Sequence, residues 1–233
     1  MIARATAIIE PGGMLGSVTC EPPLTLRQVR GEDPGRCELR LVGSAAGPLA
    51  GDDLSLSLRL LAGARATLRA TGASLAQGRF GGGATLSVDA SLEEGTSLVA
   101  EPGTLVVCDG SRVDVRLSLA LDPGAAVEWH ELIVLGRTGE PPGQATVRWD
   151  VTRAGRPVLR QFVDLTHPGP VAGCRVLASA LITDPGREPR TAVASPRAVA
   201  QRVDEHTVLI SVLADDAASA TRELASLRDA ALA

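Results

Sequence analysis

The chain has 233 residues, of which 45% are hydrophobic and 21% charged, enough to form one domain with its own apolar core. Its net charge is −4, it contains no lysine, and only 2% of its residues are aromatic, so it lacks the basic face and the stacking side chains of a nucleic-acid-binding protein. No apolar run approaches the ~20 residues that span a membrane, and Arg4 and Glu10 interrupt the opening segment where a signal peptide would be apolar. We therefore expect a soluble, cytoplasmic protein.

Alternating apolar residues predict β-strands over the first three quarters of the chain. The alternation is clear at 53–60, where every even position is leucine, and it recurs at 84–89, 113–121, 146–151 and 163–165. Gly- or Pro-containing turns separate these strands at 62–64, 94–96, 122–125 and 154–157. The pattern predicts a mainly β protein with a single domain over 1–233, in which antiparallel strands form a sandwich or a helix-like stack.

The last part of the chain, from about 195 to 233, has a different pattern. Ser195-Pro196 is typical of a helix start, and predicts a short helix that ends near residue 203. A β-branched strand is expected over 206–213. Asp215-Asp216 then favours the start of a final helix, in which Leu224, Leu227 and Ala231 recur at helical spacing. We therefore predict a tail that contains two helices.

The four cysteines, Cys20, Cys37, Cys108 and Cys174, are far apart and form no C-x-x-C pair. This spacing indicates neither a structural zinc site nor a redox motif. An even number would permit two disulfides, but a core of this size does not need them, so buried free thiols are expected.

The familiar catalytic motifs are absent from the sequence. There is no G-x-S-x-G nucleophile elbow, no Rossmann glycine fingerprint and no H-E-x-x-H, and a chain without lysine cannot form a P-loop. We expect the protein not to be an enzyme, and we expect no tightly bound cofactor.

The densest polar cluster is Glu128-Trp129-His130-Glu131. On a strand, Glu128 and His130 would share one face, which could contact a metal ion. In the simpler alternative, Trp129 packs inward while Glu128 and His130 face solvent. Asp52 also has two possible roles. An acidic turn before a strand can contact a cation or a partner, but it is more often only solvated.

Several blocks of residues occur in an order that resembles the UreD (also UreH) family of urease accessory proteins. The first block begins at Gly51-Asp52 and continues at Gly63-Ala64, and the second runs from Pro123-Gly124-Ala125 through Trp129. The most specific block ends the second segment, and consists of Leu135, Gly136, Arg137, Gly139 and Glu140. The similarity extends from about residue 5 to 232, with departures at 101–107, 141–142 and 211.

The resemblance implies a stack of β-strands with two helices and a role in urease assembly. Members of this family scaffold UreF and, through UreF, the GTPase UreG on the urease apoprotein, and a homodimer of the UreD–UreF–UreG assembly is one form of that complex. They assist nickel insertion, and nickel is proposed to cross the protein transiently. Weak oxygen and nitrogen ligands suit such transit, because a closed site would retain the ion. The resulting nickel-passage candidates are Asp52, Glu128, His130 and Glu140.

Two other functions compete with this interpretation. A β-rich module that binds a small molecule or a sugar would need a concave polar pocket, and the scarcity of aromatic residues counts against sugar stacking. A hydrolase would have to use Glu128, His130 and Glu131. Neither function predicts the ordered blocks, so the assembly role is favoured.

Overall fold

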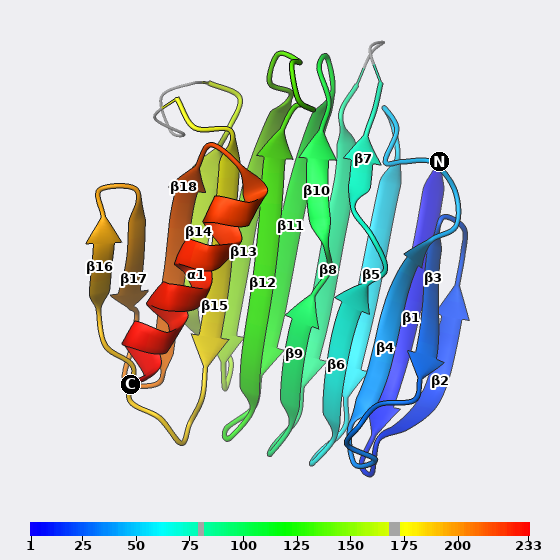
Figure 1. The fold of residues 1–233 in the computed structure, drawn as a ribbon. Coiled ribbons are helices and arrows are strands. Elements are labelled where there is room, and N and C mark those ends of the chain that lie inside the picture. Colours follow the sequence, from blue (N-terminus) through cyan, green and yellow to red (C-terminus); the bar gives the residue numbers. More distant parts are fainter. Residues whose placement is uncertain (79–81, 168–172) are drawn as a thin grey trace.

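The computed structural model describes residues 1–78, 82–167 and 173–233, and these residues form two facing β-sheets and one helix (Figure 1). The first sheet, sheet A, has the strand order β14 (Arg156–Asp164), β13 (Gln144–Arg153), β11 (Arg112–Leu121), β8 (Ala84–Leu92), β5 (Asp53–Leu60), β1 (Ile2–Glu10) and β2 (Met14–Cys20). The second, sheet B, has the order β16 (Ala192–Ser195), β17 (Ala198–Arg202), β18 (Thr207–Ala214), β15 (Val176–Thr183), β12 (Ala126–Leu135), β9 (Ser97–Glu101), β6 (Arg65–Ala70), β4 (Cys37–Gly43) and β3 (Leu24–Val29). Two short strands, β7 (Ser74–Ala76) and β10 (Thr104–Val107), pair with each other, and β10 also pairs with β12.

The middle of the chain winds as a coil between the two sheets. Glycine turns carry β5 into β6, β8 into β9 and β11 into β12, and Gly63, Gly95 and Gly124 each have a positive φ at these corners. Only glycine adopts that conformation without strain. The corners stack on one another, because the Gly63 amide donates to the Glu94 carbonyl at 2.9 Å.

Of the two predicted arrangements, a sandwich or a helix-like stack, the chain adopts the helix-like stack. Its central strands, however, are not antiparallel. Strands β1, β5, β8, β11 and β13 of sheet A run parallel to one another, and so do β4, β6, β9 and β12 of sheet B. The predicted antiparallel pairing occurs only towards the two ends of the stack, for example between β13 and β14 and between β12 and β15. The alternation of apolar residues is the same in both arrangements, and so it could not separate them.

The core lies between the inner faces of the two sheets. The four leucines of β5, at positions 54, 56, 58 and 60, are all buried there, as their alternation predicts. Trp129 on β12 and Trp149 on β13 are the largest buried side chains, each 1% exposed. The four cysteines are free thiols as predicted; Cys37, Cys108 and Cys174 are buried, whereas Cys20 is only partly buried, contrary to the prediction.

The prediction of a helix starting at Ser195-Pro196 is wrong. These residues form the turn between β16 and β17, in which the Arg197 amide donates to the Ser195 hydroxyl at 3.2 Å. Ser-Pro suits a turn as well as a helix start, and Ala198 and Ala200 are buried at strand spacing against β18. After the turn at Ser195-Pro196, the tail thus contains two strands, β17 and β18, and one helix.

The final helix, α1 (Ala217–Leu232), forms where its sequence predicts it. The Asp216 carboxylate caps its N-terminus by accepting from the Ser219 amide at 2.8 Å. Its buried residues, which include Leu224, Leu227 and Ala231, pack against the outer face of β15, β17 and β18. The helix therefore covers one end of sheet B and leaves the outer face from β12 to β3 uncovered (Figure 1).

Sheet B divides beside β12, because the first part of β12 pairs with one strand and its last part with another. Ala126 to Trp129 pair with β9, and Leu132 to Leu135 pair with β10, so His130 and Glu131 have no ladder partner on that side. The chain passes this division at Pro102-Gly103, where Gly103 has a φ of +99° and lies too close to Ala70 and to the Gly72 carbonyl to carry a side chain. Within the described residues, no helix is both long and apolar enough to cross a membrane.

Candidate functional site

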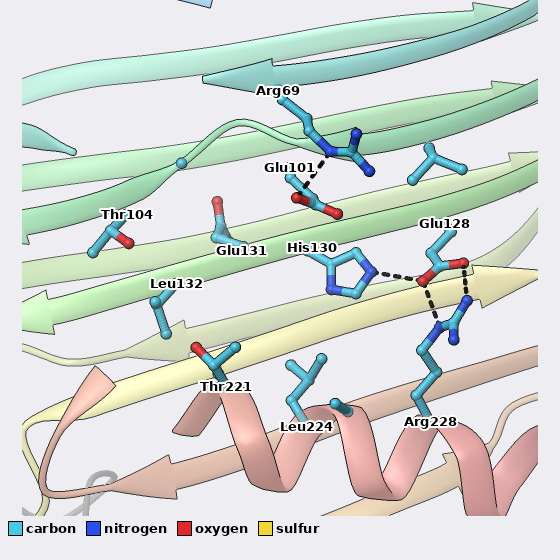
Figure 2. Close-up of a pocket in the computed structure, with 14 residues that line it drawn as sticks. Arg69, Glu101, Thr104, Glu128, His130, Glu131, Leu132, Thr221, Leu224 and Arg228 are labelled. Atoms are coloured by element: carbon cyan, nitrogen blue, oxygen red, sulfur yellow. Dashed lines mark hydrogen bonds and ion pairs between the residues drawn. The ribbon is translucent and has the colours of Figure 1, made fainter. Parts of the chain in front are cut away.

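A groove of about 530 Å³ lies between α1 and the uncovered outer face of sheet B (Figure 2). It runs beside the division in sheet B, so backbone from β9, β10 and β12 borders it together with the helix. The side chains that give it its chemistry are Arg69, Glu101, Glu128, His130, Glu131 and Arg228.

Glu128 and His130 share the outer face of β12, as the strand pattern predicts, and Trp129 between them points into the core. The Glu128 carboxylate joins His130 and the helix. Its Oε1 lies 2.8 Å from Nε2 of His130 and 2.6 Å from Nε of Arg228, and its Oε2 accepts from Arg228 at 3.0 Å. Burial raises the pKa of Glu128, but the hydrogen bonds from His130 and Arg228 outweigh it and hold the pKa at about 2. The pair therefore ties the last turns of α1 to sheet B.

A second ion pair borders the groove on the side away from the helix. Nε of Arg69 on β6 lies 3.3 Å from Oε2 of Glu101 at the end of β9. About half of each side chain is exposed, so solvent screens this pair more than the Glu128–Arg228 pair. Glu101 is therefore the more accessible carboxylate of the two at the groove.

Glu131 follows His130 but belongs to the opposite face of β12, between the two sheets. Its Oε2 accepts a hydrogen bond from Nε1 of Trp149 at 2.9 Å. Burial raises the pKa of Glu131 to about 7, and the Trp149 hydrogen bond only partly offsets that effect. A hydrolase based on Glu128, His130 and Glu131 would need all three on one side, and the strand alternation separates them.

The groove adjoins a cavity of about 130 Å³ inside the sheet stack. Gly103, Thr104, Glu131 and Leu132 line both, because the division of sheet B leaves an opening at this point. Trp129 also lines the cavity, and its buried Nε1 has no hydrogen-bond partner among the described residues. A polar carboxyl thus stands between the surface groove and the interior.

The other predicted passage residues lie away from the groove. Asp52 is 5% exposed, and its two oxygens accept from the Met1 amine at 2.7 Å and from the Leu49 amide at 2.8 Å. Burial raises the pKa of Asp52, but these two hydrogen bonds more than compensate and leave it below its usual value. The preceding Gly51, with a φ of +82°, forms the turn that leads into β5. Asp52 therefore closes a turn.

The block at 135–140 forms a loop held by its own charged residues. Arg137 donates to Oε1 of Glu140 through Nε at 2.8 Å and through Nη2, and the Arg137 amide donates to Oε2 at 3.0 Å. These hydrogen bonds from Arg137 lower the pKa of Glu140 to about 2. Arg175 then binds the carbonyls of Leu135, Arg137 and Glu140. The geometry gives the block a structural role at the end of β12.

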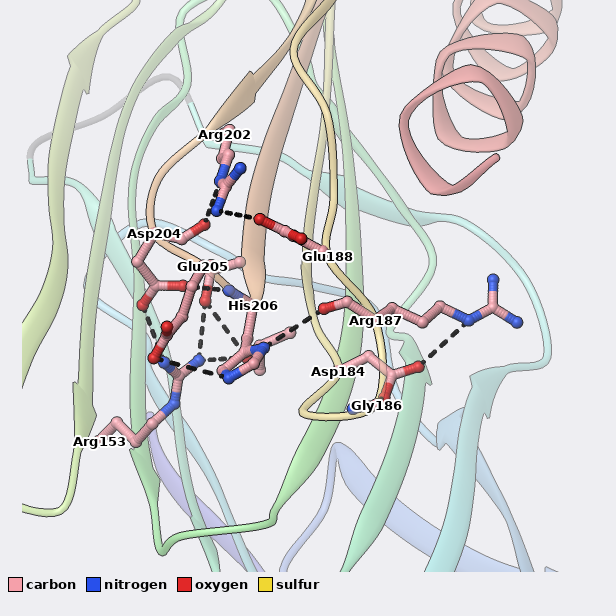
Figure 3. Close-up of polar contacts among 11 residues, drawn as sticks. Arg153, Asp184, Gly186, Arg187, Glu188, Arg202, Asp204, Glu205 and His206 are labelled. Atoms are coloured by element: carbon pink, nitrogen blue, oxygen red, sulfur yellow. Dashed lines mark hydrogen bonds and ion pairs between the residues drawn. The ribbon is translucent and has the colours of Figure 1, made fainter.

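Metal-ligating side chains do not cluster in the described part of the chain: no group of three or more His, Cys, Asp or Glu is placed to hold an ion. The polar cluster in Figure 3 instead joins the two sheets. Arg153, at the end of β13 in sheet A, donates to Asp204 at 2.8 Å, to Thr207 at 2.8 Å and to Thr183 in sheet B. Its role is to fix one end of the stack.

Sequence reasoning missed three groove residues, Arg69, Glu101 and Arg228. Arg228 is 100 positions from Glu128, and no local signal links the two. The polar alternation of β6 and β9 does place Arg69 and Glu101 on outward faces, but their adjacency depends on the parallel register of these strands.

Comparisons with known proteins identify the family of this chain. The family model described as UreD urease accessory protein matches residues 12–233. Urease accessory protein UreD of Frankia alni is 34% identical over 84% of this chain and 76% of its own length. Urease accessory protein UreD 3 of Streptomyces griseus is 32% identical over 93% of this chain and 92% of its own length. The chain therefore belongs to the UreD family of urease accessory proteins.

Proposed function

We propose that this protein is a cytoplasmic, non-catalytic scaffold that binds UreF, brings the GTPase UreG to the urease apoprotein and assists nickel insertion. The observation that carries the proposal is the match to the UreD family over 12–233, a family of urease accessory proteins. The lack of a P-loop in this chain fits a role in which the GTP chemistry belongs to a partner.

The groove gives the nickel part of the proposal a physical basis. Carboxylates and an imidazole border it, and Glu131 stands between the groove and the inter-sheet cavity. Arg228 occupies both oxygens of Glu128 and would compete with an ion for them, so Glu128 would bind an ion only weakly and exchangeably. Of the sequence-predicted passage residues, we retain Glu128 and His130 and add Glu101 and Glu131; no passage role is proposed for Asp52 or Glu140.

The scaffold role is tested in cells that express urease with its accessory proteins. Deletion of this gene is expected to leave urease protein present but poor in nickel and inactive, and re-expression is expected to restore both. Unchanged nickel content and activity after deletion would overturn the proposal.

The passage is tested separately with Glu131→Ala, using Asp150→Asn on the outer face of sheet A as the control. We expect Glu131→Ala to retain UreF in a pull-down while urease nickel content falls, and Asp150→Asn to change neither. If Glu131→Ala loads urease normally, nickel does not depend on this carboxyl.

Scaffold proteins leave interface surface uncovered when expressed without their partners. We therefore expect the chain to aggregate when produced alone and to become soluble with UreF. A fully soluble chain that ignores UreF would contradict the scaffold role.

A further inference from the structure

A row of arginines crosses the uncovered outer face of sheet B. Arg27 on β3 is paired in register with Arg40 on β4, and Arg40 is paired in register with Arg69 on β6. Neighbouring strands are about 4.8 Å apart, so three guanidinium groups are carried side by side. The row ends at Glu101 on β9, where the groove beside α1 begins.

Carboxylates within the protein compensate this row only in part. Arg69 pairs with Glu101, whereas Arg40 has only Glu38 at 3.8 Å, and its buried Nη1 makes no hydrogen bond to the described residues. Arg27 is exposed and has no ion pair with any described residue. Like charges directly opposite each other on neighbouring strands are destabilising. Carboxylates supplied from outside would relieve this repulsion.

A second in-register arginine pair, on the other side of the molecule, shows the contrast. Arg116 on β11 and Arg148 on β13 are paired on the outer face of sheet A. Each has its own aspartate, because Arg148 contacts Asp150 at 2.6 Å and Arg116 lies 3.9 Å from Asp114. The two sites differ at Arg27, which has no carboxylate partner among the described residues, whereas both arginines of the sheet A pair have one.

We propose that the Arg27–Arg40–Arg69 row binds an acidic segment of a partner protein, which continues into the groove beside α1. The arginine side chains would bind its carboxylates, and Val99, Leu132 and Leu224 in the groove would accept an apolar side chain next to the acidic residues. This inference deepens the proposed scaffold role and rests on it for the class of partner.

A protein segment fits this face better than a nucleic acid. Glu38 and Glu101 lie on the same face as the arginines and would repel a phosphate backbone. Strands β3, β4, β6 and β9 carry no aromatic residue on which bases could stack. Spaced carboxylates can fit between the acidic residues of the row, whereas a continuous run of phosphates cannot.

Fluorescence anisotropy tests the proposal on the full chain carried by a solubility fusion, with the fusion alone as the blank. The labelled probe is a ten-residue peptide in which glutamates alternate with serines and one position is leucine. We expect binding that weakens as salt is added. Arg27→Glu/Arg40→Glu is expected to weaken binding at least about tenfold. Arg27→Gln is expected to weaken it several-fold, and it breaks no ion pair between described residues. Arg116→Glu/Arg148→Glu makes the same charge change on sheet A and should alter binding less than about twofold.

The proposal is overturned if the fusion-borne chain does not bind the peptide, or if the sheet A variant loses as much affinity as the sheet B variant. It is also overturned if a DNA duplex of matched charge binds to the row more tightly than the peptide. The titration involves no urease, so its failure would leave the scaffold role standing. Conversely, failure of the gene-deletion test would not alter the measured peptide affinity.

Discussion

At the scale of single residues, the charged groups of this protein divide into those that fasten the fold and those that remain available at its surface. Arg137, Glu140 and Arg175 satisfy one another and the carbonyls of one loop. Glu131 has only the Trp149 hydrogen bond to offset its burial. The first group gives the family block at 135–140 a structural role, whereas burial raises the pKa of Glu131 and makes its ionisation depend on the fold.

The ionisation of Glu131 makes stability depend on pH. Its pKa is about 7 in the folded protein, against 4.5 for an ordinary glutamate, so the folded state holds the proton more tightly. This carboxyl therefore stabilises the fold fully below about pH 4.5, and that contribution is lost as the pH rises through about 7. Glu131→Gln keeps an acceptor for Trp149 but cannot ionise. Between about pH 5 and pH 8, we expect the free energy of unfolding of the wild type to fall relative to the variant by up to about 3 kcal/mol.

Chemical denaturation at a series of pH values measures this difference. Glu140→Gln is the control of opposite sign, because the folded-state pKa of Glu140 is lowered to about 2. The contribution of Glu140 is present above about pH 4.5 and is lost as the pH falls toward 2. If the wild-type and Glu131→Gln stabilities run parallel from pH 5 to pH 8, the buried carboxyl does not titrate as described.

Two glycines in the loop at 135–140 allow the cost of backbone strain to be distinguished from that of a steric clash. Gly136 and Gly139 have φ values of +82° and +80°, but a Cβ at Gly136 would lie 2.5 Å from the Pro141 carbonyl oxygen, whereas one at Gly139 would meet nothing within 4 Å. Gly139→Ala should therefore cost about 1 kcal/mol of unfolding free energy, from strain alone. Gly136→Ala should cost at least about 2 kcal/mol more, as the loop shifts. Equal losses in urea denaturation would contradict the close approach.

At the scale of secondary-structure elements, α1 is held by a cap, an apolar stripe and one ion pair. Asp216 supplies the cap through the Ser219 amide and hydroxyl, while the neighbouring Asp215 is 77% exposed. We expect Asp216→Ala to lower the free energy of unfolding by about 1 kcal/mol, and Asp215→Ala to change it by less than half as much. Thermal denaturation of both variants checks this. A larger effect at Asp215 would place the start of the helix elsewhere.

The fate of each predicted element has a physical explanation. Strands at 53–60 and 113–121 were predictable, because each carries leucine or valine on its buried face and mostly polar residues on the other, and that alternation is local. The final helix was predictable for a similar reason, through its cap and the spacing of Leu224 and Leu227. The parallel register was not predictable, since it depends on which strands become neighbours after the chain has wound. At Ser195-Pro196, tertiary pairing with β18 overrode a local helix signal.

The candidate site was predictable to a smaller degree. Alternation along β12 correctly placed Glu128 and His130 on one face, with Trp129 on the other. The Arg228 contact and the Arg27–Arg40–Arg69 row each join residues from different elements, so no sequence window contains them. Such sites can be found only after the register of the strands is known.

At the scale of the whole molecule, the apolar residues form two separate clusters of unequal size. The larger lies between the sheets and includes both tryptophans, and the smaller lies between α1 and the outer face of β15, β17 and β18. Because α1 contacts only the smaller cluster, we expect its amides to exchange hydrogen through openings of lower free energy than those of β11 and β13. Hydrogen exchange followed by mass spectrometry tests this. Uniform protection would show instead that the helix opens only with the whole stack.

The antiparallel strands at the two ends of the stack limit how the molecule can assemble. A parallel coil has open ends onto which a coil from another chain could add, and repeated addition would produce a fibre. Here β2 and β3 turn back along one end, while β14 and the β15–β18 segment with α1 do so at the other. An incoming parallel coil would meet strands of the opposite direction. Growth along the stack is therefore disfavoured, which leaves the broad sheet faces, rather than the ends, for contacts with other proteins.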